Sequence, residues 1–244
     1  IDWQTRQTAL KASFPLTTSN PKATYDLQVG AIERGNNDPK KYEVPQHQWF
    51  DLTAVDGKYG VAVLNDSKFG SDKPDDSTVR LTLLYTPGVR GGYQDQATQD
   101  TGRHDILYAL APHVGDWRSA NVPWTAKRLN QPLMTFQTPT HAGALGRTLS
   151  LASVSTPQVE ISALKKAEDS SEVIIRLREL RGKSASGVQV KMAAPILSAR
   201  EVNGQEAPLG PATVRNGVLM TDLGGFSLRA FALKLGRPAA HVAP

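Results

Sequence analysis

Large apolar and polar residues alternate most densely in residues 47–70, and this stretch contains two turn signals. Its first half leads into Asp56-Gly57, a dipeptide that favours the positive φ angles of a short hairpin turn. Residues 59–64 follow, and they are rich in residue types that favour β-strands. The pattern predicts two strands joined by a tight turn, with the second strand buried.

Period-two alternation recurs on both sides of this hairpin. The further strands predicted in the first half of the chain are residues 9–16, 23–32, 78–85 and 102–113. The polar stretch 33–48 is predicted to be a loop. Residues 86–102 are also predicted to be a loop, and one of this length in a compact domain is usually functional or mobile.

The pattern changes in the second half of the chain. Residues 120–148 are predicted to be an irregular linker, because Pro123, Pro132 and Pro139 are spaced along them. Short strands then resume at residues 150–155, 159–165, 173–180, 188–192, 199–202, 218–221 and 226–235. We therefore predict an all-β chain, in which residues 149–244 form a small antiparallel β-sandwich after a larger unit at 1–148.

Composition excludes several classes of protein. The 28 Lys and Arg against 23 Asp and Glu are scattered along the chain, so the net charge of +5 forms no stripe that would bind nucleic acid. No Cys occurs, which excludes disulfides and thiolate metal sites. No apolar window is long enough to span a membrane. We expect a soluble protein without a membrane or nucleic-acid partner, and the compartment, cytoplasm or periplasm, stays open.

A series of motifs carries a resemblance to a known family. They are ATYDLQVG at 23–30, WFDL at 49–52, YGVAVLNDSKFG at 59–70, RLTLL at 80–84, GRHD at 102–105, YALAPH at 108–113, LKKAE at 164–168 and RLRE at 176–179. In order and spacing the chain resembles the C-terminal β region of α-mannosidases of glycoside hydrolase family 38. The likeness spans nearly all of the 244 residues.

The resemblance implies a fold and an activity. The fold would be part of a galactose-mutarotase-like β-supersandwich, followed by a small terminal β-sandwich. Members of the family hydrolyse α-mannosides with retention, using zinc and an aspartate nucleophile in an N-terminal α/β domain. This chain would then be a non-catalytic portion that supports the enzyme and shapes its substrate site, with the upstream catalytic domain and an α-mannoside as partners. The start at Ile1 rather than Met fits an excised piece.

The residues themselves agree with that division of roles. Retaining hydrolysis needs two carboxyl groups about 5 Å apart across the scissile bond. A catalytic zinc needs a cluster of His and Asp ligands with one open position. The sequence supplies neither arrangement, so we expect no activity and no cofactor in this fragment alone, and we expect the zinc to bind the absent catalytic domain.

The resemblance also implies that side chains of the β region reach the rim of the catalytic cleft. The best candidates here are Tyr25 and the polar strand exit formed by Asn65, Asp66 and Lys68. A sugar is recognised by short side chains of mixed donor and acceptor character on a rigid strand end. The alternative is an ordinary turn in which Asn65 and Asp66 bond their own backbone.

Three further residues are weaker candidates for sugar contacts. His47 and Trp49 could stack on a pyranose ring, although a Trp in a β-sandwich more often lies in the core. His104 and His113 lie nine positions apart, an odd spacing that would place them on opposite faces of one strand and argues against joint metal binding. No metal site is predicted.

Two other functions stay open. A free-standing carbohydrate-binding module would bind mannosides by itself. A mutarotase-like sugar epimerase would need a general acid and a general base in one pocket, and only His104 or His113 with Glu33 could supply them.

Overall fold

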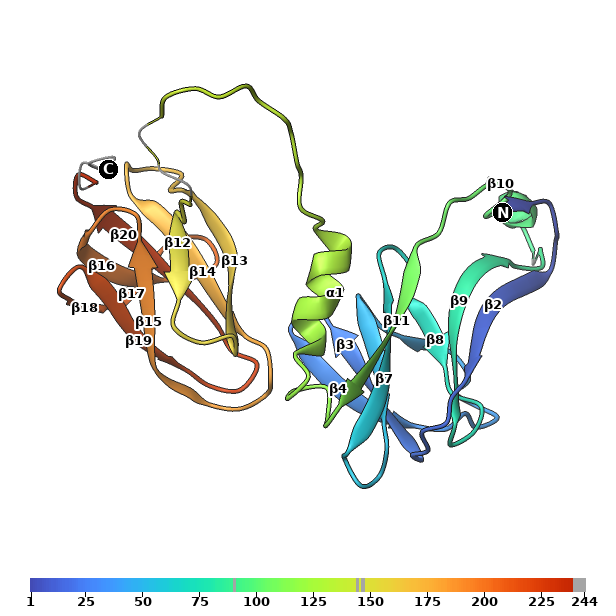
Figure 1. The fold of residues 1–244 in the computed structure, drawn as a ribbon. Helices are drawn as coiled ribbons and strands as arrows, with labels where there is room; N and C mark the ends of the chain where they lie inside the picture. Colours follow the sequence, from blue (N-terminus) through green and yellow to red (C-terminus); the bar gives the residue numbers. More distant parts are fainter. Residues whose placement is uncertain (90, 144, 146–147, 239–244) are drawn as a thin grey trace. The chain divides into compact units, whose positions relative to one another are not determined.

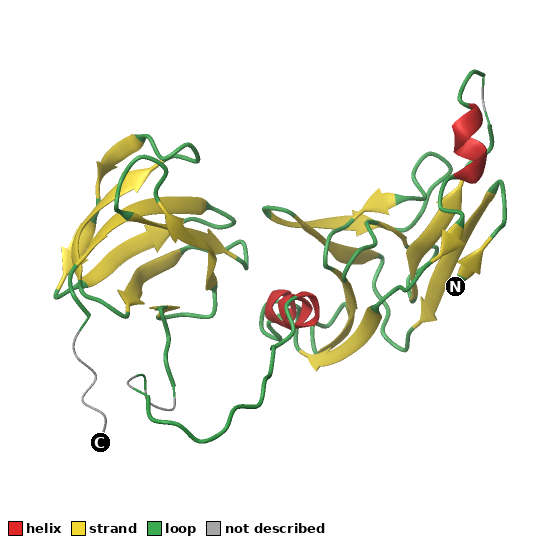
Figure 2. Ribbon diagram, turned by 90° about the horizontal axis from the view of Figure 1, so that it is seen from above, coloured by secondary structure: helices red, strands yellow, loops and turns green. Residues whose placement is uncertain are grey.

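The computed structural model of the protein describes residues 1–89, 91–143, 145 and 148–238. The chain divides into two compact units, Ile1–Met134 and Thr135–Pro244. Each unit consists almost entirely of antiparallel strands (Figures 1 and 2). The predicted all-β class is therefore confirmed. The division between the units lies within the segment 120–148.

The first unit contains two main sheets and two short helices. Its elements are β1 (Asp2–Trp3), β2 (Thr8–Pro15), β3 (Lys22–Leu27), β4 (Gly30–Gly35), β5 (Val44–Pro45), β6 (Trp49–Thr53), β7 (Tyr59–Asn65), β8 (Gly70–Asp72), β9 (Thr78–Thr86), the 3₁₀ helix η1 (Gln94–Thr98), β10 (Gly102–Arg103), β11 (Tyr108–Val114) and α1 (Val122–Asn130). A five-stranded sheet has the order β11-β7-β6-β3-β4, and a four-stranded sheet has the order β2-β9-β8-β5. β1 pairs with β10.

The inner faces of these two sheets form the core of the first unit. Tyr25, Phe50 and Val63 come from the five-stranded sheet, and Val79 and Leu81 come from the four-stranded sheet. Since side chains alternate between the two faces of a strand, the polar residues between these apolar ones lie on the outer face. The hairpin predicted around Asp56-Gly57 is confirmed, because β6 pairs with β7 and Gly57 has a φ of +70°.

The predicted linker is wrong at its start, because Val122–Asn130 forms helix α1. Pro123 lies in the first turn of this helix, where a missing backbone N–H breaks no intrahelical bond. Spaced prolines predict breaks in regular structure, but this proline begins a helix. Val122 and Ala126 bury one side of α1 against the outer face of β6 and β7. Residues 131–143 lie outside any helix or strand.

Two long predicted strands are each divided in the structure. Residues 23–32 fold as the hairpin of β3 and β4, and Gly30 has a φ of +148°, which few other residues adopt. Residues 102–113 separate into β10 and β11, which belong to different sheets. The predicted loop 33–48 contains the end of β4 and the short strand β5, and the loop 86–102 contains η1. Alternation alone cannot reveal where a strand turns back.

The second unit is an antiparallel sandwich, as predicted. Its strands are β12 (Ala152–Val154), β13 (Val159–Lys166), β14 (Val173–Glu179), β15 (Ala185–Met192), β16 (Ile196–Val202), β17 (Pro208–Pro211), β18 (Thr213–Arg215), β19 (Val218–Leu223) and β20 (Leu228–Leu235). Sheets of order β12-β15-β19-β18 and β13-β14-β20-β16-β17 enclose a core that includes Ile175, Leu177, Leu219 and Phe231. β17 and β18 were not predicted, since Pro and Gly interrupt the alternation in β17 and β18 is only three residues long.

Candidate functional site

Asn65 ends β7 and is buried. Its side-chain Nδ2 donates to the backbone oxygen of His47 at 3.0 Å, and its Oδ1 accepts from the backbone N–H of Lys68 at 2.8 Å. Nδ2 also lies 3.2 Å from Oε1 of Gln46. These bonds hold the turn against the neighbouring strand. The geometry matches the alternative in which Asn65 bonds the backbone of its own loop.

Asp66 and Lys68 follow in the same turn and are more accessible. The carboxylate of exposed Asp66 accepts from the hydroxyl of Ser67 at 2.9 Å. Lys68 is half-buried, and within the described residues no ion pair joins it to Asp66. The His47 ring lies edge-on to Phe69, with 5.9 Å between the ring centroids. The structure thus gathers His47, Asn65, Asp66 and Lys68 at one end of β7.

The other two weak candidates lie in different surroundings. Trp49 is buried, and its ring centroid is 5.0 Å from that of Trp117, so it packs between the sheet and the segment that leads to α1. His104 is half-buried, follows β10, and has its Nε2 2.7 Å from the backbone oxygen of Asp100. Neither residue joins the group around Asn65 through a hydrogen bond within the described part of the chain.

Tyr25 lies on the face of the sheet opposite to Trp49, because it is paired with Phe50. It is only 1% exposed, yet it lines a hollow of about 510 Å³. The hollow is bounded by Tyr25, Ile32, Glu33, Arg34, Gly35, Asn36, Asn37, Asp38, Lys41, Val44 and Lys73. We call it the Tyr25 hollow. It is formed by the hairpin of β3 and β4, the loop after β4, the start of β5 and the residue that follows β8.

The Tyr25 hydroxyl makes no hydrogen bond to any residue that the structure describes. Burial raises the pKa of Tyr25 to about 12, and the Arg34 guanidinium, 5.2 Å from the ring centroid, opposes this only in part. The phenol therefore stays neutral and can both donate and accept. An unpaired hydroxyl beside a hollow is a candidate contact for a ligand.

Asp72 is a buried carboxylate at the end of β8, close to the Tyr25 hollow. It accepts from Nζ of Lys11 at 2.9 Å, from Nδ2 of Asn37 at 2.7 Å and from Nε of Arg80 at 3.0 Å. Burial by itself would raise the pKa of Asp72, but the bonds from Arg80, Lys11 and Asn37 outweigh burial and lower it. Asp72 is therefore ionised, and it fixes the position of Asn37 at the hollow.

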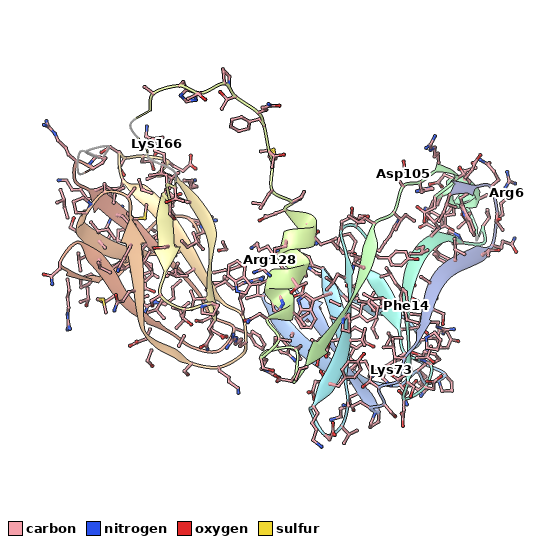
Figure 3. All side chains as sticks on the ribbon, viewed as in Figure 1. Arg6, Phe14, Lys73, Asp105, Arg128 and Lys166 are labelled. Atoms are coloured by element: carbon pink, nitrogen blue, oxygen red, sulfur yellow. The ribbon has the colours of Figure 1, made fainter. Side chains whose placement is uncertain are left out.

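Lys73 is fully buried and lines the same hollow (Figure 3). Its Nζ donates to Oδ1 of Asn36 and to the backbone oxygen of Asp75, both at 2.5 Å. Burial lowers the pKa of Lys73, and the charges of Asp76 and Asp75 oppose that shift. Sequence reasoning missed this residue, because Asp72-Lys73-Pro74 has the composition of an exposed turn.

A second, smaller hollow of about 270 Å³ lies on the outer face of the five-stranded sheet. We call it the Asp51 hollow, and it is bounded by Asn20, Lys22, Thr24, Glu33, Asp51, Thr53, Asp116, Trp117 and Arg118. Asp51 is buried and accepts from Oγ1 of Thr53 at 2.5 Å. Thr24 on β3 pairs with Glu33 on β4 and with Asp51 on β6. The carboxylates of Glu33 and Asp51 therefore lie on the same face of the sheet.

His113 approaches Asp51 from β11. Its Nε2 donates to Oδ2 of Asp51 at 2.6 Å, and its Nδ1 donates to the backbone oxygen of Gly115 at 3.1 Å. A carboxylate and a backbone carbonyl are both acceptors, so this geometry favours the charged form of the ring, in which both nitrogens carry a proton. Burial would lower the pKa of His113, but the bond and charge of Asp51 outweigh it and raise the pKa. Since both ring nitrogens are occupied, this geometry does not support an epimerase that uses His113 with Glu33.

The described residues do not form a zinc centre. No group of three or more His, Asp or Glu side chains among them could hold a metal ion. None of the described helices has the length and apolar character needed to cross a membrane.

Two family models and several known relatives match this chain. The model for the "Glycosyl hydrolases family 38 C-terminal domain" matches residues 1–89, and that for the "Glycosyl hydrolases family 38 C-terminal beta sandwich domain" matches residues 158–235. Alpha-mannosidase 2C1 of Mus musculus and of Homo sapiens are each 32% identical to it over 248 residues. The alignment covers 98% of this chain and 23% of each relative.

Structural similarity gives the same fold. A crystal structure of a protein in glycosyl hydrolase family 38 from Enterococcus faecalis matches 96% of this chain and 27% of that chain, with a TM-score of 0.76 and 19% identity. The fold and the matches define a β-sandwich region of a glycoside hydrolase. The chain belongs to glycosyl hydrolase family 38 and is part of its C-terminal region. The resemblance stated from the motifs is therefore confirmed.

Proposed function

We propose that this chain is the non-catalytic C-terminal portion of a zinc-dependent, retaining α-mannosidase. One observation carries the proposal: two C-terminal models of the family match the two units, while the chain spans only 23% of the length of relatives named alpha-mannosidase. Most of such an enzyme lies outside these 244 residues. The catalytic nucleophile and the zinc ion would belong to that upstream domain.

Within that enzyme the chain would have a structural and substrate-shaping role. Each unit has its own apolar core between two sheets, and the Tyr25 hollow offers polar groups at its surface. The neutral Tyr25 hydroxyl, together with the accessible Asp66 and Lys68, supplies donors and acceptors suited to sugar hydroxyls. These residues would contact an α-mannoside at the rim of the cleft, without taking part in bond cleavage.

The test is made on the complete polypeptide that contains this chain and, in parallel, on the chain alone. We expect the complete protein to bind stoichiometric zinc, and NMR of the first-formed sugar should show the α-anomer. The chain alone should bind no stoichiometric zinc. An inverted product would contradict the retaining mechanism, and zinc bound tightly by the chain alone would contradict the placement of the metal in the upstream domain.

A free-standing carbohydrate-binding module is the second candidate, and the Tyr25 hollow favours it. Such a module would bind methyl α-mannoside in the absence of any other domain. Calorimetric titration of the chain alone distinguishes the two functions, because a substrate-shaping part is expected to bind the sugar only when the catalytic domain completes the site.

A further inference from the structure

Three polar groups that border the Tyr25 hollow have hydrogen-bonding capacity that the protein does not fill. The hydroxyl of Tyr25 is buried and has no partner within the described residues. The guanidinium of Arg34 has five N–H groups, and the bond to the backbone oxygen of Pro45, at 2.8 Å, uses one of them. Lys73 has three N–H groups on Nζ, and two of them are used within the described part of the chain. Each group can therefore still donate to a ligand.

These three groups come from different segments but line the same hollow. Tyr25 on β3 pairs with Ile32 on β4, and Arg34 lies two residues further along β4, so these three side chains share one face of the sheet. The guanidinium carbon of Arg34 lies 5.2 Å from the centroid of the Tyr25 ring. Lys73 follows β8 and lines the hollow from there (Figure 3). The hollow, of about 510 Å³, has the size of a small-molecule site.

The two carboxylates that border the hollow do not satisfy these donors. Glu33 pairs with Thr24, so its side chain lies on the face of the sheet opposite to Tyr25. Asp38 is exposed, and its Oδ1 accepts from the backbone N–H of Lys40 at 2.7 Å, which closes its own turn. Within the described residues neither carboxylate forms a hydrogen bond with any of the three donors.

Three further carboxylates lie close to the end of β8, and each already has partners. Asp72 is paired with Lys11 and Arg80. Asp75 accepts from two backbone N–H groups, and Asp76 accepts from a side-chain amide of the loop after β4. Asp75 and Asp76 are exposed and do not line the hollow. The donors of the Tyr25 hollow are therefore left for an acceptor from outside the described chain.

Free donors of which two carry a positive charge are suited to an anion, because hydrogen bonds between ions are stronger than those to a neutral sugar hydroxyl. We propose that the Tyr25 hollow binds the phosphate or carboxylate group of a mannose derivative, with Tyr25, Arg34 and Lys73 as its donors. The inference deepens the proposed function and rests on it for the mannosyl part of the ligand. One anionic group fills only part of the hollow, which leaves room for the sugar. A bound anion would also oppose the burial that lowers the pKa of Lys73.

The first test is calorimetric titration of the complete polypeptide with mannose 6-phosphate, with mannuronate and with methyl α-mannoside, which is neutral. At least one of the charged sugars should bind at least about tenfold more tightly than methyl α-mannoside, since one hydrogen bond between ions is enough for such a difference. Tighter binding of mannose 6-phosphate would assign a phosphate to the hollow, and tighter binding of mannuronate would assign a carboxylate. Equal affinities for the charged and neutral sugars would overturn the inference.

Substitutions locate the charged sugar. Arg34→Gln should weaken its binding at least about tenfold. Arg118→Gln is the matched control, because Arg118 also lies over an aromatic ring, 4.2 Å from the centroid of Trp117, but outside the Tyr25 hollow. Tyr25→Phe is a second variant that keeps the ring and removes only the hydroxyl, and it should weaken binding at least about threefold. Binding that Arg34→Gln and Tyr25→Phe leave unchanged would overturn the inference.

The result is separable from that of the proposed function. Charged-sugar binding that depends on Arg34, in a complete polypeptide that binds no zinc or inverts its product, would refute the proposed function alone. Zinc-dependent, retaining hydrolysis of a neutral α-mannoside by a polypeptide that shows no preference for the charged sugars would overturn this inference alone.

Discussion

Both units are antiparallel β-sandwiches, but they differ in what surrounds their buried charged residues. In the first unit Asp51, Asp72 and Lys73 are buried beside hollows. In the second unit the buried carboxylate of Glu179 accepts backbone N–H groups of Arg181, Gly182 and Phe226. Buried charges with satisfied hydrogen bonds stabilise both units, and those of the first unit also fix the side chains that line the hollows.

The largest effect is expected at Asp72, the centre of the buried charges in the first unit. Asp72→Ala leaves the ammonium of Lys11 and the guanidinium of Arg80 without their shared partner. We expect a loss of about 3 kcal/mol in unfolding free energy, the lower end for a broken buried ion pair, because both cations are partly exposed. Urea unfolding measures it. Asp169→Ala, at an exposed loop position, is the control, and similar losses for both variants would contradict the role of Asp72.

Glu179 tests the second unit in the same way. Glu179→Gln keeps the shape of the side chain but replaces one acceptor oxygen by a donor, so at least one of the three backbone N–H groups loses its partner. A loss of about 1.5–3 kcal/mol is typical of hydrogen bonds to a charged group. Thermal unfolding should show it, with Glu168→Gln as the exposed control. An unchanged melting temperature would mean that Glu179 does not hold the turn.

Tyr25 separates a binding role from a folding role in the first unit. Tyr25→Phe removes a hydroxyl that has no partner within the described residues, so stability should stay the same. If the hydroxyl touches substrate in the transition state, kcat/KM of the complete enzyme should fall at least about tenfold. Tyr85→Phe, at an exposed position, is the control. Unchanged kinetics would remove Tyr25 from the substrate rim.

The accessible turn after β7 gives a parallel test. Asp66→Ala and Lys68→Ala should each lower kcat/KM of the complete enzyme by at least about tenfold if these groups contact substrate. A lower melting temperature with unchanged kinetics would assign the turn to folding. Asn65 is unsuitable for this test, because its side chain already holds the turn through three hydrogen bonds.

The smallest expected effect is a pH dependence of the stability of the first unit. The pKa of His113 is raised in the folded state above its ordinary value of 6.5. Its contribution to stability is therefore fully present below pH 6.5 and is lost as the pH rises through the folded pKa. The melting temperature of the first unit should fall over that range, and His113→Gln should remove this part of the decline. A variant with the same pH profile as the parent chain would contradict the charged pair with Asp51.

Alternation and turn chemistry predicted most of the fold. The hairpin at Asp56-Gly57 and the all-β class follow from short-range patterns. Helix α1 was missed because Pro123 looks like a breaker until its position in the first turn is known. The β3–β4 hairpin was missed because the alternation of apolar and polar residues continues without a break across Gly30. The turn depends on the positive φ angle of Gly30, which the hydrophobic pattern does not reveal.

The candidate site was predicted less completely. Tyr25 and the turn at Asn65 came from the resemblance, and the structure places them on different parts of the sheet. Asp72 and Lys73 could not be found from local pattern, since their burial depends on partners far along the chain: Lys11 for Asp72 and Asn36 for Lys73. A charged turn and a buried charge pair have the same composition, and only tertiary packing distinguishes them.

Hydrolysis of an aryl α-mannoside by the chain alone and by the complete polypeptide tests the central claim most directly. We predict release of the aryl group by the complete polypeptide, with no release by residues 1–244 above the rate in buffer, even with added zinc. Hydrolysis by the chain alone that a chelator abolishes would contradict the account, because the catalytic groups would then lie within these two sandwiches.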